Sequence, residues 1–514
     1  MNAENSSSSN TLDPVLFWGC FIALVTCAFG FIVRTQVIGD WQTELNLSNT
    51  QVGELSGVGF WPFAFSIIIF SLFIDKVGYK PVAIFGLICH ALSTVILITA
   101  KSYEMLYLGT FIFALSNGTV EAYINPVVAA AKSKEKGKWL SILHAGWPGG
   151  SALAGIIAIM MSDVSWQTRV AITFIPTIIY GIMLFPKKFP ISERVAAGVS
   201  HKEMLRDFGG IGFFIATYLV ALQVLNGIFQ MDNAFLWSLL PAILVGVAMT
   251  AVLGGAGHPV GILLMIIMLP LATTELGIDS WVTPLMGPAM QDLGIENAGW
   301  LLVYTMVIMT VLRFMAGPIL VLFKDNPFNL LAFSSALAIV GLFALSSATG
   351  MMILVAATLY GVGKTFFWPM MLAAGNEQCP KGGAMTLNSI GGVGMLGLSV
   401  GMVFLGAIQD DKISADLGVY DEANQSNLIE NYTIEKEGLF GTYRSIDQEK
   451  LNSANEADKK TIDDVTAQAK KSALKTSTVF PVIMLISYLI FIFYYKASGG
   501  YKPIELNTVD ISNK

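Results

Sequence analysis

Long apolar runs decide what this chain can fold into. A window of about 20 residues, the length of helix that crosses the hydrocarbon core of a bilayer, finds fourteen such runs, at roughly 14–38, 51–74, 81–100, 104–130, 139–161, 167–186, 209–229, 235–255, 258–290, 299–322, 328–346, 350–375, 383–408 and 477–496. Only 13% of the 514 residues are charged, about half the share in a typical soluble protein. The expected fold class is therefore an all-α polytopic membrane protein with about 14 transmembrane helices.

Basic residues in the connectors set the expected orientation in the membrane. The connectors 76–80, 132–138 and 187–208 are rich in Lys and Arg and alternate with poorly basic ones. Because basic loops stay on the cytoplasmic side, we expect an integral protein of the plasma (inner) membrane with both termini in the cytoplasm.

Three polar segments lie outside the expected spans. Residues 1–13 have no basic region of the kind that opens a signal peptide, so they are predicted to be a disordered tail, and residues 497–514 a cytoplasmic tail. Residues 409–475 are predicted to form a long polar loop on the outer side. Within it, 454–475 has helical propensity and is expected to fold as part of an amphipathic hairpin or cap.

An internal repeat divides the chain into two halves. With offsets of 239 to 245 residues, Asp40-Trp41 recurs as Asp279-Ser280-Trp281, Asn125-Pro126 as Trp368-Pro369, and Gly146–Gly150 as Gly391–Gly394. We expect two six-helix pseudo-repeat bundles, at 14–186 and 258–496, joined by the cytoplasmic connector 187–208 and by two inserted transmembrane helices within 209–257. Paired repeats that enclose a site near the middle of the membrane are the plan of secondary transporters.

Several motifs resemble those of a known family. Ser71–Lys80, between the second and third apolar runs, resembles the loop signature of the major facilitator superfamily. Within that superfamily, the spacing of Gly118, Glu121 and Asn125-Pro126 resembles the fourth-helix motif of the fucose–galactose–hexose proton symporters. The likeness continues through Trp281, Arg313-Phe-x-x-Gly317, Trp368-Pro369 and Gly391-Gly392. The resemblance implies alternating access and the uptake of a sugar together with a proton.

Two positions depart from that pattern. The sugar symporters resemble one another in carrying an Asn–Asp pair in the first helix, where the Asp helps proton coupling, but the same position here is Arg34-Thr35. In the fifth helix the family's Gln and Asn are replaced by His144 and Trp147. We therefore expect Glu121 to carry more of any proton coupling, and the substrate to differ in detail.

Glu121 is the first candidate for a functional group. It lies four residues from both Asn117 and Asn125, so the three share one face of a helix. A carboxylate facing lipid would cost several kcal/mol, so this face should border a protein interior or a water-filled cavity. Burial disfavours the charged form of a carboxyl, which suits a proton-loading site. The alternative is a structural carboxylate paired with Arg34 or Lys364.

Other charged residues within the spans are candidates for substrate binding. Arg34 is expected either to clamp an anionic group, to balance Glu121, or to snorkel toward the outer interface. Lys364 is expected to contact substrate or to pair with Glu121 or Glu275. Glu275 stands near the repeat position of Arg34, so the two halves are expected to present opposite charges across one cavity.

Aromatic and amide side chains complete the predicted site. Trp147, Trp281 and Trp368 suit stacking on a sugar ring, although helix packing explains any one of them equally well. His144 is expected to be either a proton relay with Glu121 or a histidine satisfied in the core. Asn117 and Asn125 suit hydrogen bonds to a hydroxylated ligand or between helices.

A second predicted group serves gating. The charges of Asp75, Lys76 and Lys80 are expected to latch the cytoplasmic ends of helices in one conformation. Arg313 and Glu377, toward the cytoplasmic ends of their spans, are assigned similar roles.

These patterns define the expected function and its alternatives. No nucleotide-binding loop, metal constellation or catalytic cluster stands out, so we expect neither an enzyme nor a cofactor, and no nucleic-acid partner. The prediction is a monomeric secondary active transporter of a sugar or sugar-derived small molecule, moved with a proton. One alternative is transport of an organic anion such as a uronate. Another is a non-transporting receptor or sensor that uses residues 409–475.

Overall fold

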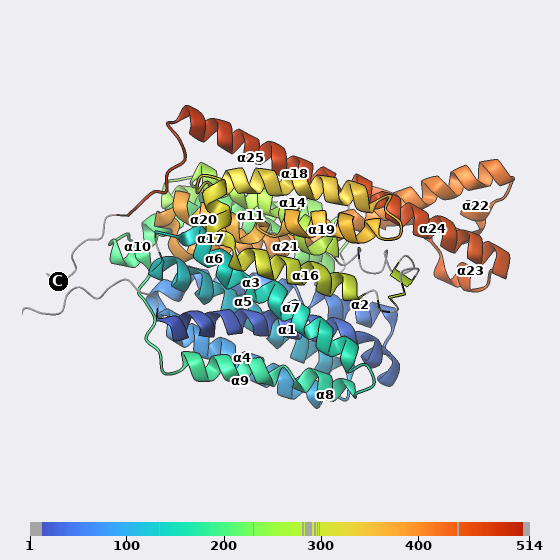
Figure 1. Cartoon of the computed structure of the whole chain (residues 1–514), viewed down its shortest axis with the longest axis horizontal. Helices are drawn as coiled ribbons and strands as arrows, with labels where there is room; N and C mark the ends of the chain where they lie inside the picture. Colours follow the sequence, from blue (N-terminus) through green and yellow to red (C-terminus); the bar gives the residue numbers. More distant parts are fainter. Residues whose placement is uncertain are drawn as a thin grey trace, which may run out of the picture.

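The chain folds into a bundle of long, roughly parallel helices with a small extension at one end (Figure 1). The structure, a computed structural model, describes residues 13–132, 134–229, 231–279, 282, 290–291, 294–295, 297, 299–438 and 441–506. Within these residues the only sheet is a two-stranded hairpin outside the bundle. The predicted all-α polytopic fold class is confirmed.

The first half contains α1 to α9. Their bounds are α1 (Pro14–Glu44), α2 (Asn49–Gly57), α3 (Trp61–Val77), α4 (Tyr79–Ile98), α5 (Tyr103–Ala131), α6 (Lys136–His144), α7 (Gly146–Met160), α8 (Trp166–Ala171) and α9 (Phe174–Leu184). A connector with the short helix α10 (Glu193–Ala196) follows.

The second half begins after an inserted helix pair. The inserted elements are α11 (His201–Leu222), its π-helical continuation η1 (Gln223–Ile228), α12 (Ala234–Trp237) and α13 (Leu239–Leu253). The helices of the second half are α14 (Pro259–Ala272), the π-helical turn η2 (Thr273–Gly277), α16 (Gly299–Phe314), α17 (Ala316–Leu322), α18 (Pro327–Leu345), α19 (Met352–Lys364), α20 (Phe367–Gln378), the 3₁₀ turn η3 (Pro380–Gly382), α21 (Gly383–Asn424) and α25 (Val479–Ala497).

The number of spans agrees with the apolar runs. Twelve helical segments of the described residues are long and apolar enough to cross a membrane, and α16 with α17, bent by 73°, makes a thirteenth. α5 has 29 residues, roughly 44 Å of helix, and its lower hydropathy follows from Asn117, Glu121 and Asn125. Thirteen of the fourteen predicted runs therefore correspond to a candidate span, and the run at 104–130 corresponds to α5, which is long enough but less apolar.

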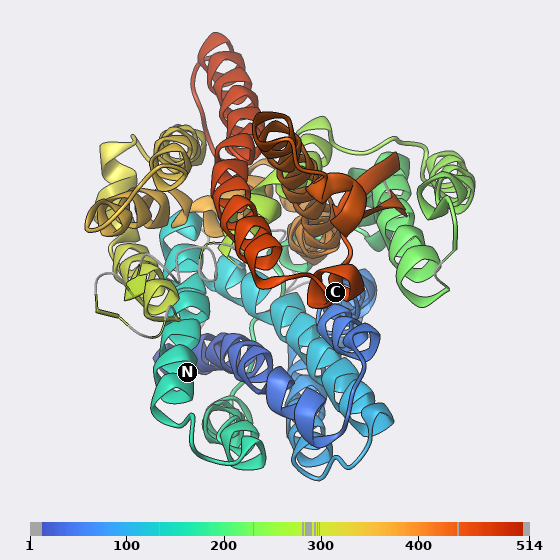
Figure 2. The ribbon, with the colours of Figure 1, turned by 90° about the vertical axis from the view of Figure 1, so that its right-hand side faces the viewer.

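The two halves pack side by side. Seen along the helix axes, the first half (blue to teal) and the second half (yellow to red) occupy opposite sides of the molecule (Figure 2). They meet where α7 packs against α16, α3 against α21, and α6 against α20. These contacts enclose the centre of the bundle.

The inserted pair lies on the outside of the second half. α11 packs against α21, whereas α13 packs mainly against α11 and exposes most of its surface. α11 turns sharply at Gly209, where φ is +66° and an added Cβ would lie 2.0 Å from the Gly257 nitrogen. The inserted pair therefore lies at the periphery of the bundle.

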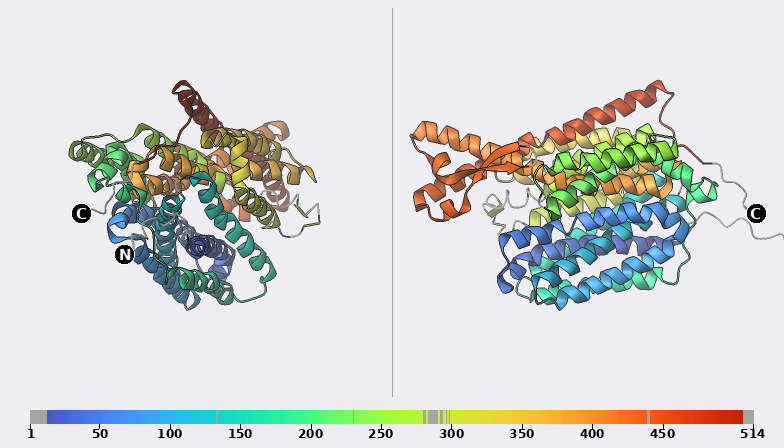
Figure 3. Two further views of the ribbon diagram at one scale, coloured as in Figure 1. Left: turned by 60° about the vertical axis from the view of Figure 1, so that its left-hand side comes forward. Right: turned by 180° about the vertical axis from the view of Figure 1, so that it is seen from behind.

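The outer segment folds into a stalk that projects beyond the bundle (Figures 1 and 3). α21 continues to Asn424, and α24 (Glu456–Thr476) runs back beside it, with α22 (Leu428–Tyr432), β1 (Thr433–Gly438), β2 (Gly441–Ile446) and α23 (Gln448–Asn452) between them. A small core that includes Leu417 and Ile462 holds these elements together. The predicted helix within 454–475 is confirmed as α24.

Candidate functional site

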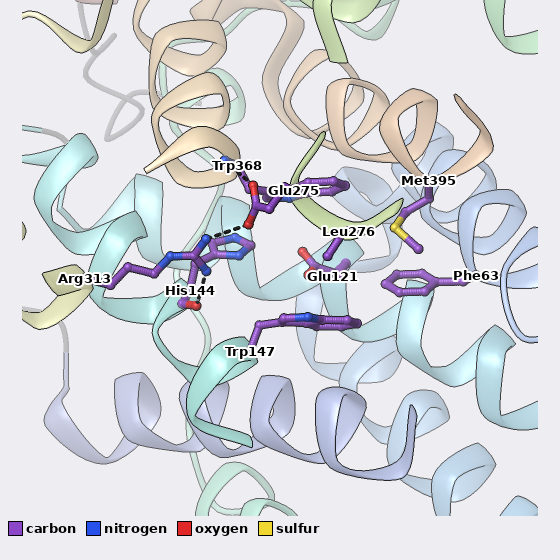
Figure 4. A pocket seen from close by; sticks show the side chains of 9 residues that line it. All are labelled: Phe63, Glu121, His144, Trp147, Glu275, Leu276, Arg313, Trp368 and Met395. Atoms are coloured by element: carbon purple, nitrogen blue, oxygen red, sulfur yellow. Dashed lines mark hydrogen bonds and ion pairs between the residues drawn. The ribbon is translucent and has the colours of Figure 1, made fainter. Parts of the chain in front are cut away.

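A small pocket lies at the centre of the interface between the halves (Figure 4). Its volume is about 20 Å³, room for roughly one water molecule. The side chains around it come from both halves: Phe63, Glu121, His144, Trp147, Glu275, Leu276, Arg313, Trp368 and Met395. Six of these nine were candidates from the sequence, five for proton coupling or substrate binding and one, Arg313, for gating.

A larger cavity adjoins this pocket on one side. It measures about 530 Å³ and shares Trp147, Leu276 and Met395 with the central pocket. Its other walls include Phe31 of α1, Ile159 at the end of α7 and residues near the start of α16, which lie toward the side assigned as external. On the opposite side α3, α6, α20 and α21 close the interface. The conformation is therefore outward-facing with respect to the predicted orientation.

Glu121 points into the central pocket and has no cationic partner among the described residues. Its side chain is 6% exposed, and Oε2 accepts a hydrogen bond from Asn125 Nδ2 at 2.6 Å. The expected alternative partners bond elsewhere, as described below for Arg34 and Lys364. A structural ion pair for Glu121 is thus absent from this part of the chain, whereas buried carboxylates ordinarily have one.

Asn125 and His144 extend this contact. Because Asn125 Nδ2 donates to Glu121, its Oδ1 accepts, and His144 Nε2 donates to that oxygen at 2.8 Å. Both side chains are buried. The chain Glu121–Asn125–His144 is therefore continuous, and the side chain of Asn125 is engaged within the protein.

Arg313 lines the pocket and joins the two halves there. Its Nη2 donates to Glu275 Oε1 at 2.7 Å and its Nη1 to the His144 carbonyl at 2.8 Å (Figure 4). Glu275 Oε2 also accepts the backbone N–H of Trp368 at 3.1 Å. We expected Arg313 in a cytoplasmic latch, but it belongs to the central site, because the break between α16 and α17 places it in mid-span. Glu275 was expected to face Arg34 across one cavity, but Arg34 does not line this pocket.

Lys364 pairs with a carboxylate that the sequence reasoning did not choose. Its Nζ donates to both oxygens of Asp279, and the lysine side chain is fully buried. Asp279 lines the outer cavity, and Lys364 lies behind it, over the ring of Tyr360. The expected pairing of Lys364 with Glu121 or Glu275 was therefore wrong. Asp279 entered the sequence argument only through the repeat, although an ionisable group inside a span is itself a signal.

Arg34 lies away from Glu121. Its Nη1 donates to the carbonyls of Leu55 at 2.9 Å and Ser56 at 3.5 Å, at the end of α2. The guanidinium lies over the rings of Phe31 and Phe60, a favourable cation–π arrangement. The expected substrate clamp or counter-charge for Glu121 is thus not formed; Arg34 joins α1 to α2.

Asn117 also lies outside the site. Its Oδ1 bonds to His90 Nε2 at 2.9 Å, and His90 Nδ1 to the Tyr180 hydroxyl at 2.9 Å, so His90 Nε2 donates and Nδ1 accepts. All three side chains are buried within the first half. The expectation that Asn117 binds substrate does not agree with this position, because two helical turns above Asn125 the same face of α5 meets α4 rather than the cavity.

The three predicted tryptophans do not share one location. Trp147 borders both the pocket and the outer cavity, and Trp368 lies at the base of the pocket. Trp281 lies outside the described residues. The outer cavity also has neutral polar walls at Thr35, Gln36 and Ser151.

The predicted cytoplasmic latch has one strong contact. Asp75 Oδ2 accepts from Arg194 Nε at 2.9 Å and Nη2 at 2.8 Å, and both side chains are nearly fully buried. Arg194 belongs to α10, which packs against η3 of the second half. Lys76 is exposed, and Lys80 lies over the ring of Phe185. Of the three predicted residues, Asp75 thus makes the buried ion pair, with Arg194, which the sequence reasoning used only for orientation; the latch role itself stays a prediction.

Glu377 binds the chain's own C-terminal segment. The Tyr501 hydroxyl donates to its Oε2 at 2.5 Å, and the Ile504 N–H to its carbonyl at 2.8 Å. Burial and the Glu377 carboxylate both raise the pKa of the Tyr501 phenol well above its usual range, so it remains a donor. Glu377 thus fastens the tail to α20.

The two-bundle fold with a pocket at its centre defines a polytopic membrane transporter. The model of the Major Facilitator Superfamily matches residues 19–410, and the chain belongs to this superfamily. This confirms the family predicted from the sequence motifs.

Known structures agree with this fold. The chain is similar to the E. coli fucose:proton symporter FucP in its outward conformation, with 13% identity, a TM-score of 0.58, and coverage of 92% of this chain and 98% of FucP. It is similar to the proton:xylose symporter XylE, with 12% identity, a TM-score of 0.57, and coverage of 93% and 95%. It is also similar to the human organic anion transporter MFSD10, with 11% identity, a TM-score of 0.57, and coverage of 93% of this chain and 100% of MFSD10. At these identities the likeness concerns the fold alone.

One curated relative matches part of the chain. The gentisate transporter of Corynebacterium glutamicum is 22% identical over 195 residues, which cover 37% of this chain and 43% of that transporter. The match thus spans less than half of the relative's length.

Proposed function

We propose that this protein is a secondary active transporter that works by alternating access and takes up a sugar or sugar-derived small molecule with a proton. The observation that carries the proposal is Glu121, a buried carboxyl at the interface of the halves that is bonded to an amide and, among the described residues, to no cation. Such a group changes its charge far more readily than one held in an ion pair.

The proton step follows from the contacts of Glu121. In the outward-facing conformation only Trp147, Leu276 and Met395, which line both spaces, lie between the pocket and the outer cavity, so protons are expected to reach the carboxyl from outside. Neutral Glu121 is compatible with a closed, dry interface, because no buried charge is left uncompensated. Release of the proton to the cytoplasm then resets the carrier.

The lining of the outer cavity supports a neutral, hydroxylated substrate. Thr35, Gln36 and Ser151 offer hydrogen bonds, and Trp147 and Phe60 offer aromatic faces for the apolar face of a sugar ring. Asp279 is the one charged side chain among the described lining residues, and Lys364 neutralises it.

The same charges weigh against an organic anion. Arg313 and Lys364 are each bonded to a carboxylate, and Arg34 to backbone carbonyls. An anion would have to displace one of these partners, whereas a neutral ligand leaves them in place.

Uptake into proteoliposomes tests the proposal. With the outside acidified by one pH unit, wild-type protein is expected to accumulate a labelled neutral sugar from a panel of hexoses and pentoses, and a protonophore is expected to abolish the accumulation. Excess uronate should compete poorly. Accumulation of the uronates and none of the neutral sugars would contradict the sugar assignment, and accumulation insensitive to the protonophore would contradict proton coupling.

Trp147→Ala is expected to raise the KM for substrate about tenfold, because an aromatic stacking partner contributes on the order of 1 kcal/mol beyond its buried area. Trp147→Phe should retain part of the affinity. The measurement is initial uptake rate against substrate concentration, with Trp237→Ala as control, since Trp237 is exposed on the inserted pair. Equal KM values for Trp147→Ala and the control would remove Trp147 from the substrate site.

A further inference from the structure

Prolines leave two backbone carbonyls of the first half without their helical partners. Proline has no N–H, so the carbonyl four residues before it cannot form the usual helical hydrogen bond. Pro126 lies inside α5 and leaves the Ala122 carbonyl unbonded, and Pro148 in α7 does the same to the His144 carbonyl. The hydrogen bonds that both carbonyls accept are buried, so an unsatisfied acceptor at either position would be costly.

The opposite half supplies both missing donors. Asn388 Nδ2, from α21, donates to the Ala122 carbonyl at 2.8 Å, and Arg313 Nη1, from α16, donates to the His144 carbonyl at 2.8 Å. Asn388 is 2% exposed and Arg313 is 1% exposed. Two independent breaks in the first half are thus each repaired by a side chain of the second half.

Arg313 makes the same repair within its own half. Pro369, at the start of α20, leaves the Thr365 carbonyl without its helical donor, and Arg313 Nε donates to that oxygen at 2.7 Å. One guanidinium therefore bonds proline-broken helices of both halves, held in place by Glu275.

The Asn388 bonds lie on the closed side of the interface, and the Arg313 bonds lie at the central pocket. Asn388 also donates to Ser71 Oγ at 2.9 Å, and both residues are near the ends of α21 and α3 that adjoin the basic, cytoplasmic loops. The outer cavity is on the other side of the pocket. Opening the inner side would separate exactly those helices that the two bonds connect.

We propose that Asn388 and Arg313 are positioning residues that hold the inner side closed by capping proline-orphaned carbonyls of the opposite half. The inference rests on the proposed alternating access. In the closed interface the carbonyls need a protein donor, because water is excluded. When the halves part, water donates hydrogen bonds to the carbonyls instead. Replacing each protein donor by water therefore changes the free energy only a little. The two carbonyls thus give a directional contact that forms only in one conformation.

A double-mutant cycle tests the Asn388 contact. Spin labels at Lys134→Cys and Lys324→Cys, both exposed in cytoplasmic loops of opposite halves, report the inner separation by pulsed electron resonance. The four native cysteines are first replaced by serine or alanine. Asn388→Ala is expected to raise the ratio of inward-open to inward-closed protein roughly tenfold, as for loss of one net hydrogen bond. In a Pro126→Ala background, where the restored N–H bonds the Ala122 carbonyl, the same substitution should change the ratio less than about threefold.

Matched substitutions separate this role from packing. Ser389 is buried next to Asn388 in the chain, and its hydroxyl has no hydrogen-bond partner in the described part of the chain. Ser389→Ala should therefore leave the ratio of inward-open to inward-closed protein unchanged. Ser71→Ala removes the second acceptor of Asn388, the Ser71 hydroxyl, and measures how much that hydrogen bond contributes to the closed conformation. Equal effects of Asn388→Ala in both backgrounds, or no effect in the native background, would overturn the proposal.

A second variant avoids any folding defect of Asn388→Ala. Pro148→Ala gives the His144 carbonyl its own helical donor, so Arg313 holds the halves together less strongly, and the inward-open share should rise several-fold. An unchanged share in Pro148→Ala would overturn the Arg313 contact. The comparison of variants needs neither substrate transport nor proton coupling, so its outcome is independent of the uptake test. In a separate measurement, a single inner separation in wild-type protein at every pH, with and without sugar, would contradict alternating access itself.

Discussion

Glu121→Gln is expected to abolish pH-driven accumulation and to retain substrate exchange. The amide keeps the hydrogen-bonding shape of the neutral carboxyl beside Asn125, so the carrier can still alternate with substrate bound. It cannot release a proton. A gradient of one pH unit is worth about 1.4 kcal/mol per proton and so drives up to roughly tenfold accumulation in wild-type protein, which should fall to about onefold in the variant.

The measurement compares two assays on the same vesicles. Counterflow of labelled against unlabelled substrate should proceed at a comparable rate in both proteins, whereas accumulation under the gradient should be confined to the wild type. Glu54→Gln is a suitable control, because Glu54 is a carboxylate of the same half that bonds Tyr103 away from the pocket. Full accumulation in Glu121→Gln would exclude this carboxyl from coupling.

Arg313→Gln is expected to lower the free energy of unfolding by about 3–5 kcal/mol, because it leaves Glu275 charged and buried without its partner. The double variant Arg313→Gln with Glu275→Gln should recover a large part of the loss, since two neutral amides carry no uncompensated charge. Thermal unfolding in detergent, followed by size-exclusion chromatography, measures the difference.

A surface pair provides the matched control for this prediction. Lys459 and Glu456 lie 3.5 Å apart on exposed α24, so Lys459→Gln should change stability by less than about 1 kcal/mol. If the double variant unfolds as readily as Arg313→Gln alone, the loss arises from the carbonyl contacts at His144 and Thr365 rather than from the unpaired charge.

The sequence predicted those features that depend on neighbouring residues in the chain. Thirteen of the fourteen apolar runs correspond to candidate spans, because hydropathy over about 20 residues decides membrane insertion locally. The helix α24 was also predictable, because helical propensity is likewise a property of neighbouring residues in the chain. The central position of Glu121 followed from the cost of placing a carboxylate toward lipid.

The partners of the charged residues were not predictable in this way. Lys364 was expected to bond Glu121 or Glu275 and bonds Asp279, which is 85 residues distant in sequence. Arg34 was expected near the cavity and bonds the end of α2, where Gly59 leaves room for its guanidinium, since an added Cβ would lie 1.9 Å from Nη1. Such pairings depend on which helices adjoin and on how each is rotated about its axis, and apolar runs contain little information on either.

The sequence by itself thus determined an all-α membrane protein of two related halves, with a carboxyl near the middle of the fourth span. Only the tertiary structure decided that Glu121 bonds to no cation in the described part of the chain, that Arg313 lies at the centre, and that its donors reach the carbonyls left by Pro148 and Pro369. The physical reason is the range of the interactions. Hydropathy acts within one segment, whereas hydrogen bonds and ion pairs require atoms of different helices to lie within about 3 Å.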